Sequence, residues 1–311
     1  ATDRRIDLVE LNGLATGEGP KLPTERFALT ARASQPAANA NESYSANVGL
    51  QRASGTEPLF STDAEYATST RTIAGTWKLD IRAETLAALL AGMGLPEIAA
   101  TGTGKFSVSP GTQAVAATGD LQGSATHLEK ISPELAPIGA VRFRASFDGG
   151  LAGDNARLAR LQLEALNAGG QRLAQIETLQ PIGYGLTDQR VSLANPKAEV
   201  ARVAVQALPL AWAQPFVKTL AIDSGDLSLS LVVEAEADGS HVRARALEPL
   251  ALRGVTVRSG DTKLADRVTL TLRPNLDYTP AKLTAQITEL DLSMPAGDRL
   301  TGTVTAEVAN L

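Results

Sequence analysis

The chain has 311 residues, a formal net charge of −5 and no cysteine, which excludes disulfides, thiolate metal sites and a cysteine nucleophile. A mildly acidic chain without a basic run also argues against nucleic-acid binding, because that binding depends on Lys and Arg meeting phosphates. No apolar run approaches the roughly 18–20 residues of a membrane-spanning helix, and no signal peptide is recognisable at the start.

The N-terminal part has the least regular pattern. We expect residues 1–75 to be rich in β-structure and loops, with residues 31–46 forming a long exposed connection or a poorly ordered hairpin. A helix is predicted next, over residues 84–93, because four apolar residues fall on one helical face: Leu86, Leu89, Leu90 and Met93.

The rest of the chain alternates apolar and polar residues with the period of two that is typical of half-buried strands. Residues 141–147 show it, and residues 227–233 and 242–246 show it on both sides of a turn at Asp238-Gly239, which predicts a hairpin. Residues 157–179 have the composition of a helix, but a break at 167–170 makes a hairpin the favoured interpretation. Short helical turns are expected at 132–135 and 208–212.

These elements predict a mainly β chain, an antiparallel meander that forms a curved, groove-like or sandwich-like sheet with one or two short helices. We divide it into an irregular part at 1–75, a β-rich part at 76–200 and a β-meander at 201–311, or treat it as one continuous domain. No helices alternate with the strands, so a doubly wound α/β fold is not expected.

Catalytic motifs are missing from the sequence. Residues 101–106 (TGTGKF) are superficially similar to a phosphate-binding loop, but the earlier glycine and the final hydroxyl residue are absent, which favours a Gly-rich hairpin turn. His127 and His241 are the only imidazoles, and exposed polar side chains are the favoured interpretation of both. We therefore predict no catalytic residues, no metal site and no cofactor.

One pair of carboxylates keeps an enzymatic alternative open. Glu234 and Glu236 are two residues apart on a predicted strand, a spacing that a carbohydrate-active enzyme could use. Alternating Glu residues more often form the solvated face of an amphipathic sheet. Only two Trp, four Tyr and six Phe are available as platforms for sugar rings, which argues against this class.

Two segments resemble the AsmA-like family of Gram-negative envelope proteins, which includes the proteins built as a repeating β-groove. In residues 79–110 a strand leads into AETLAALLAGMGLP and then into strands bracketed by glycines. In residues 208–233 LPLAW precedes IDSGDLSL. The likeness extends loosely over residues 70–311.

This resemblance implies a non-enzymatic envelope module that acts in lipid transport or outer-membrane biogenesis through an apolar β-groove. It implies a periplasmic location, as a soluble segment of a protein held at the membrane by an N-terminal anchor, with a phospholipid or another acyl-chain ligand and other envelope proteins as partners. Small aliphatic side chains on one sheet face suit such a ligand. The candidate groove residues are Leu227, Leu229, Leu231, Val268, Leu270, Leu272 and Ile287.

The alternatives are a structural or adhesive β-rich scaffold, whose apolar face packs against protein, and the carbohydrate-active enzyme. The sequence does not distinguish an apolar face that is open from one that is closed as an ordinary core.

Overall fold

The computed structural model describes residues 9–16, 26–34, 43–52, 58–85, 95–217 and 219–309. Most of these residues are in β-strands, and the strands pair antiparallel along the chain, which confirms the predicted mainly β meander. By their mutual contacts the residues form two units. Unit 1 comprises Ala1–Thr126 and Arg144–Ala156, and unit 2 comprises His127–Phe143 and Arg157–Leu311.

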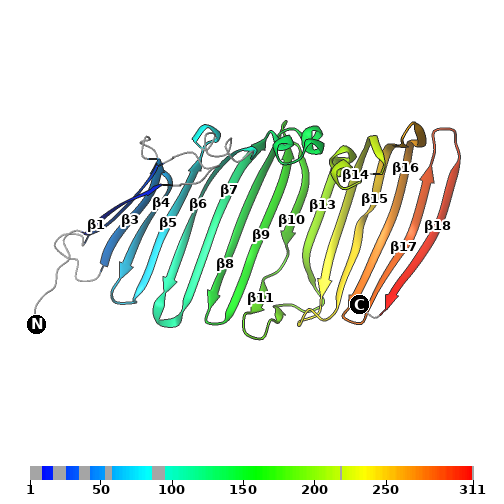
Figure 1. The fold of residues 1–311 in the computed structure, drawn as a ribbon. Coiled ribbons are helices and arrows are strands. Elements are labelled where there is room, and N and C mark those ends of the chain that lie inside the picture. Colours follow the sequence, from blue (N-terminus) through cyan, green and yellow to red (C-terminus); the bar gives the residue numbers. More distant parts are fainter. Residues whose placement is uncertain are drawn as a thin grey trace, which may run out of the picture. The chain divides into compact units, whose positions relative to one another are not determined.

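Unit 1 is a meander in which each strand pairs with the next (Figure 1). Its elements are β1 (Val9–Thr16), β2 (Arg26–Ser34), β3 (Ser43–Arg52), β4 (Pro58–Ala67), β5 (Thr72–Ile81), β6 (Glu97–Ser109), the 3-10 turn η1 (Pro110–Thr112) and β7 (Ala114–Thr126). Strands β8 (Val141–Ala152) and β9 (Asn155–Asn167) have residues in both units.

In unit 2, β10 pairs with both β9 and β13, and the strands from β13 to β18 each pair with the next. Its elements are η2 (Leu128–Lys130), η3 (Pro133–Ile138), β10 (Arg172–Thr178), β11 (Ile182–Gly185), β12 (Val191–Leu193), β13 (Glu199–Pro209), η4 (Leu210–Phe216), β14 (Ala221–Ala235), β15 (Val242–Ser259), β16 (Thr262–Thr279), β17 (Lys282–Ser293) and β18 (Arg299–Ala309). Strands β11 and β12 form a small hairpin between β10 and β13 in the chain.

The predicted hairpins are confirmed. Strands β9 and β10 pair across the break at 167–170, so residues 157–179 form strands and not a helix. Strands β14 and β15 pair around Asp238-Gly239. A 3-10 turn, η3, lies at the helical turn predicted at 132–135. The turn predicted at 208–212 begins later, because Leu208 and Pro209 end β13 and η4 begins at Leu210. The helix predicted over 84–93 is described only at its start, where Ala83–Thr85 is helical. Residues 86–94 lie outside the described residues.

The N-terminal part is more regular than the sequence indicates. Strands β2 and β3 pair without a register shift, from Phe27 opposite Arg52 to Ser34 opposite Ser45. Strand β4 pairs with β5 without a shift as well. Residues 31–46 were expected to form a long exposed connection or a poorly ordered hairpin, and the antiparallel pairing of β2 with β3 at the two ends of this segment is that of a hairpin. Residues 35–42 lie outside the described residues.

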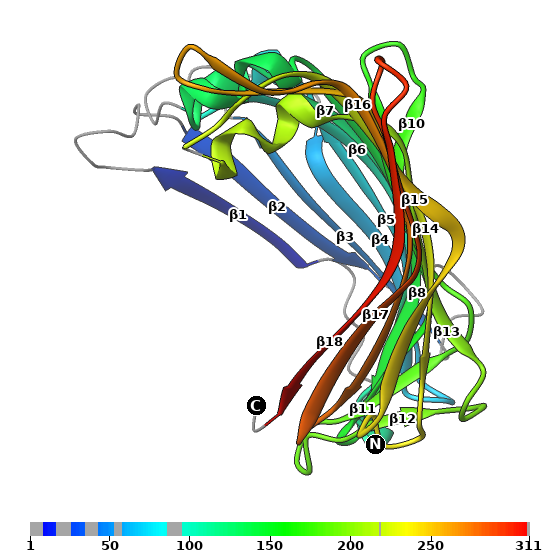
Figure 2. The same cartoon turned by 90° about the vertical axis from the view of Figure 1, so that its right-hand side faces the viewer.

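Strands β14 to β16 bend along their length, as the view in Figure 2 shows. The ladders between β13, β14, β15 and β16 contain several register shifts at which one strand carries extra residues. Backbone with positive φ occurs at these shifts, at Ala207, Gly254 and Arg267. Bulges of this kind bend a strand and increase its twist, which explains the curvature of the sheet in unit 2.

Each unit is one layer of strands, so the curved form of the prediction is observed and the sandwich-like form is not. A single layer can bury few side chains completely. The buried hydrophobic residues among those described are Leu59 in unit 1, and Leu166, Leu173, Leu193, Val200, Val232, Ala246 and Ala251 in unit 2. None of the described helices is long and apolar enough to cross a bilayer.

Candidate ligand-binding face

A row of six leucines crosses unit 2. Residues that lie directly opposite in antiparallel strands project on the same face of a sheet. The register places one leucine from each of six consecutive strands in such a row: Leu208, Leu227, Leu252, Leu270, Leu292 and Leu300. Strands lie about 4.8 Å apart, so the row extends for about 24 Å across the strands.

The seven predicted groove residues lie on the face that carries this leucine row. Leu227, Leu229 and Leu231 alternate along β14, and Val268, Leu270 and Leu272 alternate along β16. Ile287 of β17 lies between Pro274 and Val304 in the register. All seven are half-buried. We call the side of unit 2 that these residues share the leucine face.

The leucine face is only partly covered within unit 2. Part of the cover comes from η4, whose Leu210 Cδ1 lies 3.0 Å from the position that a Cβ atom on Gly225 would take. Many of its apolar side chains remain exposed, among them Leu276 at 40% and Leu300 at 60%. No second sheet packs on this face in the part of unit 2 that the structure describes.

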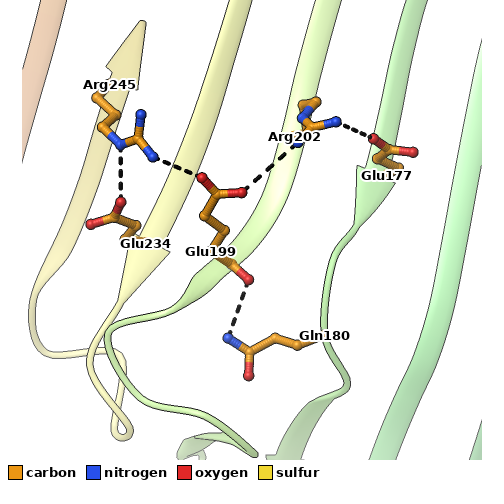
Figure 3. A network of polar contacts seen from close by, with 6 residues as sticks. All are labelled: Glu177, Gln180, Glu199, Arg202, Glu234 and Arg245. Atoms are coloured by element: carbon orange, nitrogen blue, oxygen red, sulfur yellow. Dashed lines mark hydrogen bonds and ion pairs between the residues drawn. The ribbon is translucent and has the colours of Figure 1, made fainter. Parts of the chain in front are cut away.

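The opposite face of unit 2 is polar. Figure 3 shows a line of ion pairs that crosses β10, β13, β14 and β15. These strands run from right to left in Figure 3 and from left to right in Figure 1. Glu177 pairs with Arg202 (3.4 Å), Arg202 with Glu199 (3.9 Å), and Glu199 with Arg245 (2.7 Å), which also contacts Glu234 (3.0 Å). In Figure 2, η4 lies on the concave side of the bent strands, so the leucine face is concave and the polar network convex.

Val232 lies beneath this polar network. It is opposite Arg202 on one side and Arg245 on the other, and it has no exposed surface. The aliphatic stems of long cationic side chains often cover apolar surface in this way while the charged ends stay in water. The network therefore also covers one of the few completely buried residues of the sheet.

The apolar face of unit 1 differs in chemistry because it is aromatic. Trp77 and Phe147 lie nearly parallel, with ring centroids 6.3 Å apart and an interplanar angle of 13°. Tyr44 and Tyr66 lie opposite each other in β3 and β4, with centroids 6.4 Å apart. Phe106 joins them on this face, over Gly75. The contacts between aromatic rings among the described residues therefore lie in unit 1, whereas the leucine face of unit 2 is mainly aliphatic.

The glycine-rich segment at 101–106 was predicted to be a hairpin turn, and this is wrong. It lies in the middle of β6, paired with β5 and β7. A Cβ atom on Gly102 or Gly104 would collide with neighbouring backbone and side chains, and Trp77 contacts both positions. The glycines make room for the indole ring.

His241 was predicted to be exposed, and this is also wrong. Its side chain is 20% exposed, and Nε2 lies 2.9 Å from Asp277 Oδ1, while Nδ1 lies 3.7 Å from Glu236. Arg243 donates to the same Asp277 carboxylate. Hydrogen bonds from His241 and Arg243 lower the pKa of Asp277, with the His241 contribution the larger. His127 is 52% exposed and contacts Glu129, as expected of an exposed side chain.

The two candidate carboxylates of an enzyme have different environments. Glu234 is on β14 and accepts a hydrogen bond from Arg245 Nε. Glu236 follows the end of β14, at the turn, near His241. Both line one open pocket of about 120 Å³ together with Lys197, His241 and Arg243. The cationic residues around the carboxylates make this an ion-pair cluster, and no group of three or more potential metal ligands occurs among the described residues.

Comparisons with protein-family models, with curated proteins and with solved structures found no significant match to this chain.

Proposed function

We propose that this chain is a non-enzymatic module that holds phospholipid or other acyl chains against the leucine face of unit 2. The observation that carries the proposal is the row of six leucines, one on each strand from β13 to β18, which no second layer covers in the described part of unit 2. Large exposed apolar surfaces on a protein generally mark a binding site for protein, lipid or membrane.

The dimensions of the row suit a hydrocarbon chain. The hydrocarbon core of a bilayer is about 30 Å thick, so one leaflet, and one acyl chain, corresponds to about 15 Å. The leucine row, at about 24 Å, is longer than this. Each methylene group of the ligand that is completely removed from water contributes about 0.8 kcal/mol to the free energy of binding. An acyl chain on an open face stays partly in water, so each of its methylenes contributes part of that value.

The cellular setting is the second part of the proposal. The resemblance of residues 70–311 to AsmA-like proteins supports a periplasmic segment of a membrane-anchored protein that acts in lipid transport or outer-membrane biogenesis. Acyl chains would reach such a segment from the envelope membranes, and other envelope proteins would be its neighbours.

Two matched variants test the lipid part. Leu270→Asn places an amide in the leucine row, whereas Thr271→Asn places the same amide on the polar face of the same strand. We expect lipid to be extracted from the purified protein, and Leu270→Asn to bind a fluorescent fatty acid roughly tenfold less tightly than the unmodified chain. Thr271→Asn should bind it normally.

Absence of extracted lipid, together with equal fatty-acid binding by both variants, would overturn the proposal. Circular dichroism of each variant separates a loss of binding from a loss of folding. If the chain retains no lipid and instead captures one envelope protein through the leucine face, the scaffold alternative replaces the lipid-binding one.

A further inference from the structure

The pocket where β14 ends and β15 begins is lined by side chains of both charges. Glu234 and Arg243 lie opposite each other on the polar face of the sheet. Lys197, from the segment before β13, and Glu236 and His241, from the turn between β14 and β15, complete the lining. The volume of about 120 Å³ is smaller than the roughly 300–1,000 Å³ of a pocket for a drug-sized ligand, so the pocket suits a small polar group.

Two opposite charges face this pocket without pairing with each other. Lys197 has no ion-pair partner among the described residues, although Glu236 lines the same pocket. The nearest cationic group to Glu236 is His241 Nδ1, at 3.7 Å, which is too far for a hydrogen bond. The Glu236 side chain is 45% exposed, so its oxygens are open to a ligand. A free ammonium and a largely free carboxylate therefore share one pocket.

The backbone that carries Lys197 is held in place. Its φ of +67° is in the left-handed region, which is uncommon for a residue other than glycine, and its N–H donates to the carbonyl of Ala235 (3.0 Å). Gln180 donates to the carbonyls of Asn195 and Glu199 on either side and accepts from the N–H of Asn195 (Figure 3). A segment that is ordered in advance loses less entropy when a ligand binds.

We propose that this pocket binds a small zwitterion, a phosphoethanolamine group, with its phosphate at Lys197 and Arg243 and its ammonium at Glu236. Arg243 donates from Nε to Asp277, and its terminal amino groups make no hydrogen bond in the described part of the chain. Arginine and lysine are the usual partners of phosphate oxygens, and a carboxylate is a strong acceptor for an ammonium.

The mixed lining disfavours a ligand with a single charge. An anion at Lys197 would be repelled by Glu236, and a cation at Glu236 would be repelled by Lys197. Glu234 already accepts a hydrogen bond from Arg245, which leaves Glu236 as the carboxylate for the ligand. The inference does not depend on the acyl-chain proposal, because the row of Glu234 and Arg243 is on the face opposite the leucine face.

Isothermal titration calorimetry with phosphoethanolamine, inorganic phosphate and ethanolamine provides the test. Phosphoethanolamine should bind the unmodified chain more tightly than either of the other two. Lys197→Gln should weaken the binding of phosphoethanolamine and of phosphate, each by about fivefold or more. Glu236→Gln should weaken phosphoethanolamine by a similar factor without weakening phosphate, and the retained phosphate binding shows that the variant is folded.

Lys263→Gln is the matched control. Lys263 pairs with Asp266 (3.3 Å) near the start of β16 and does not line the pocket, so this variant should bind all three compounds normally. No binding of phosphoethanolamine, or binding no tighter than that of phosphate, would overturn the proposal. So would Lys197→Gln and Glu236→Gln variants that bind phosphoethanolamine as the unmodified chain does.

Two further measurements identify the source of the group. Tighter binding of dihexanoyl phosphatidylethanolamine than of phosphoethanolamine would assign the pocket to a lipid headgroup, and binding of phosphoethanolamine alone would assign it to the free compound. Leu270→Asn, which tests the acyl-chain proposal, should leave phosphoethanolamine binding unchanged. The two proposals can therefore fail separately.

Discussion

The indole of Trp77 occupies the space above Gly119. A Cβ atom on that glycine would collide with the six-membered part of the ring and would lie 3.1 Å from Cε1 of Phe147. The three atoms nearest to that position all belong to the side chains of Trp77 and Phe147, so the glycine and the tryptophan depend on each other directly.

Gly119→Ala should destabilise unit 1 by about 1–3 kcal/mol, the usual range for an added methyl group in a filled site. The same substitution in a Trp77→Ala background should cost much less, because the ring that it collides with is gone. Urea unfolding followed by far-ultraviolet circular dichroism measures the four members of this cycle. Equal costs in both backgrounds would show that Trp77 does not limit the site.

Val232→Ala should destabilise unit 2 by roughly 2 kcal/mol, because it removes buried methyl groups and leaves a cavity beneath the two arginine stems. Val304→Ala is the control, since Val304 is 47% exposed and its truncation should change the free energy of unfolding by less than about 0.5 kcal/mol. Denaturant unfolding of both variants provides the comparison. A loss at Val232 no larger than that at Val304 would contradict the described burial.

Glu199→Gln removes the central carboxylate of the polar network, which pairs with both Arg202 and Arg245. These side chains are substantially exposed, so we expect a loss of less than about 1 kcal/mol. The loss should shrink in about 1 M salt, where the screening length is near 3 Å. A loss that is large and independent of salt would mean that the network holds the sheet together.

Acid should remove the contribution of Asp277 to stability. His241 and Arg243 lower its pKa in the folded chain below the unfolded value of about 3.9, so the folded state binds the proton less well than the unfolded state. The stabilisation is therefore present above about pH 4 and is lost as the pH falls through the folded pKa. In Asp277→Asn the fall in stability below pH 4 should be shallower. An unchanged pH profile would contradict the role of this carboxylate.

The alternation of residues was enough to predict the strands that carry the leucine face. Leu227, Leu229 and Leu231 repeat with period two, and each strand nearby does the same, so a mainly β meander with one apolar face follows from the sequence. The hairpin at β9 and β10 was also predictable, because 167–170 interrupts a segment that otherwise has the composition of a helix.

The leucine row itself was not predictable. The alignment of the six leucines depends on bulges in the ladders from β13 to β16, where extra residues in one strand change which residues lie opposite each other. No local sequence pattern marks the positions of these extra residues. The contact between His241 and Asp277 joins residues 36 positions apart, so its partner could be found only after the register was known. Glycines within β6 were mistaken for turn residues, although they mark the close approach of Trp77.

The distribution of tryptophan has a practical consequence. Trp77 lies on β5 of unit 1 and Trp212 lies on η4 of unit 2, and the sequence has no other tryptophan. Each unit therefore has its own intrinsic fluorophore. A chain with Trp212→Phe reports the unfolding of unit 1 alone, and one with Trp77→Phe reports that of unit 2, so fluorescence can establish whether the two units melt together or in sequence.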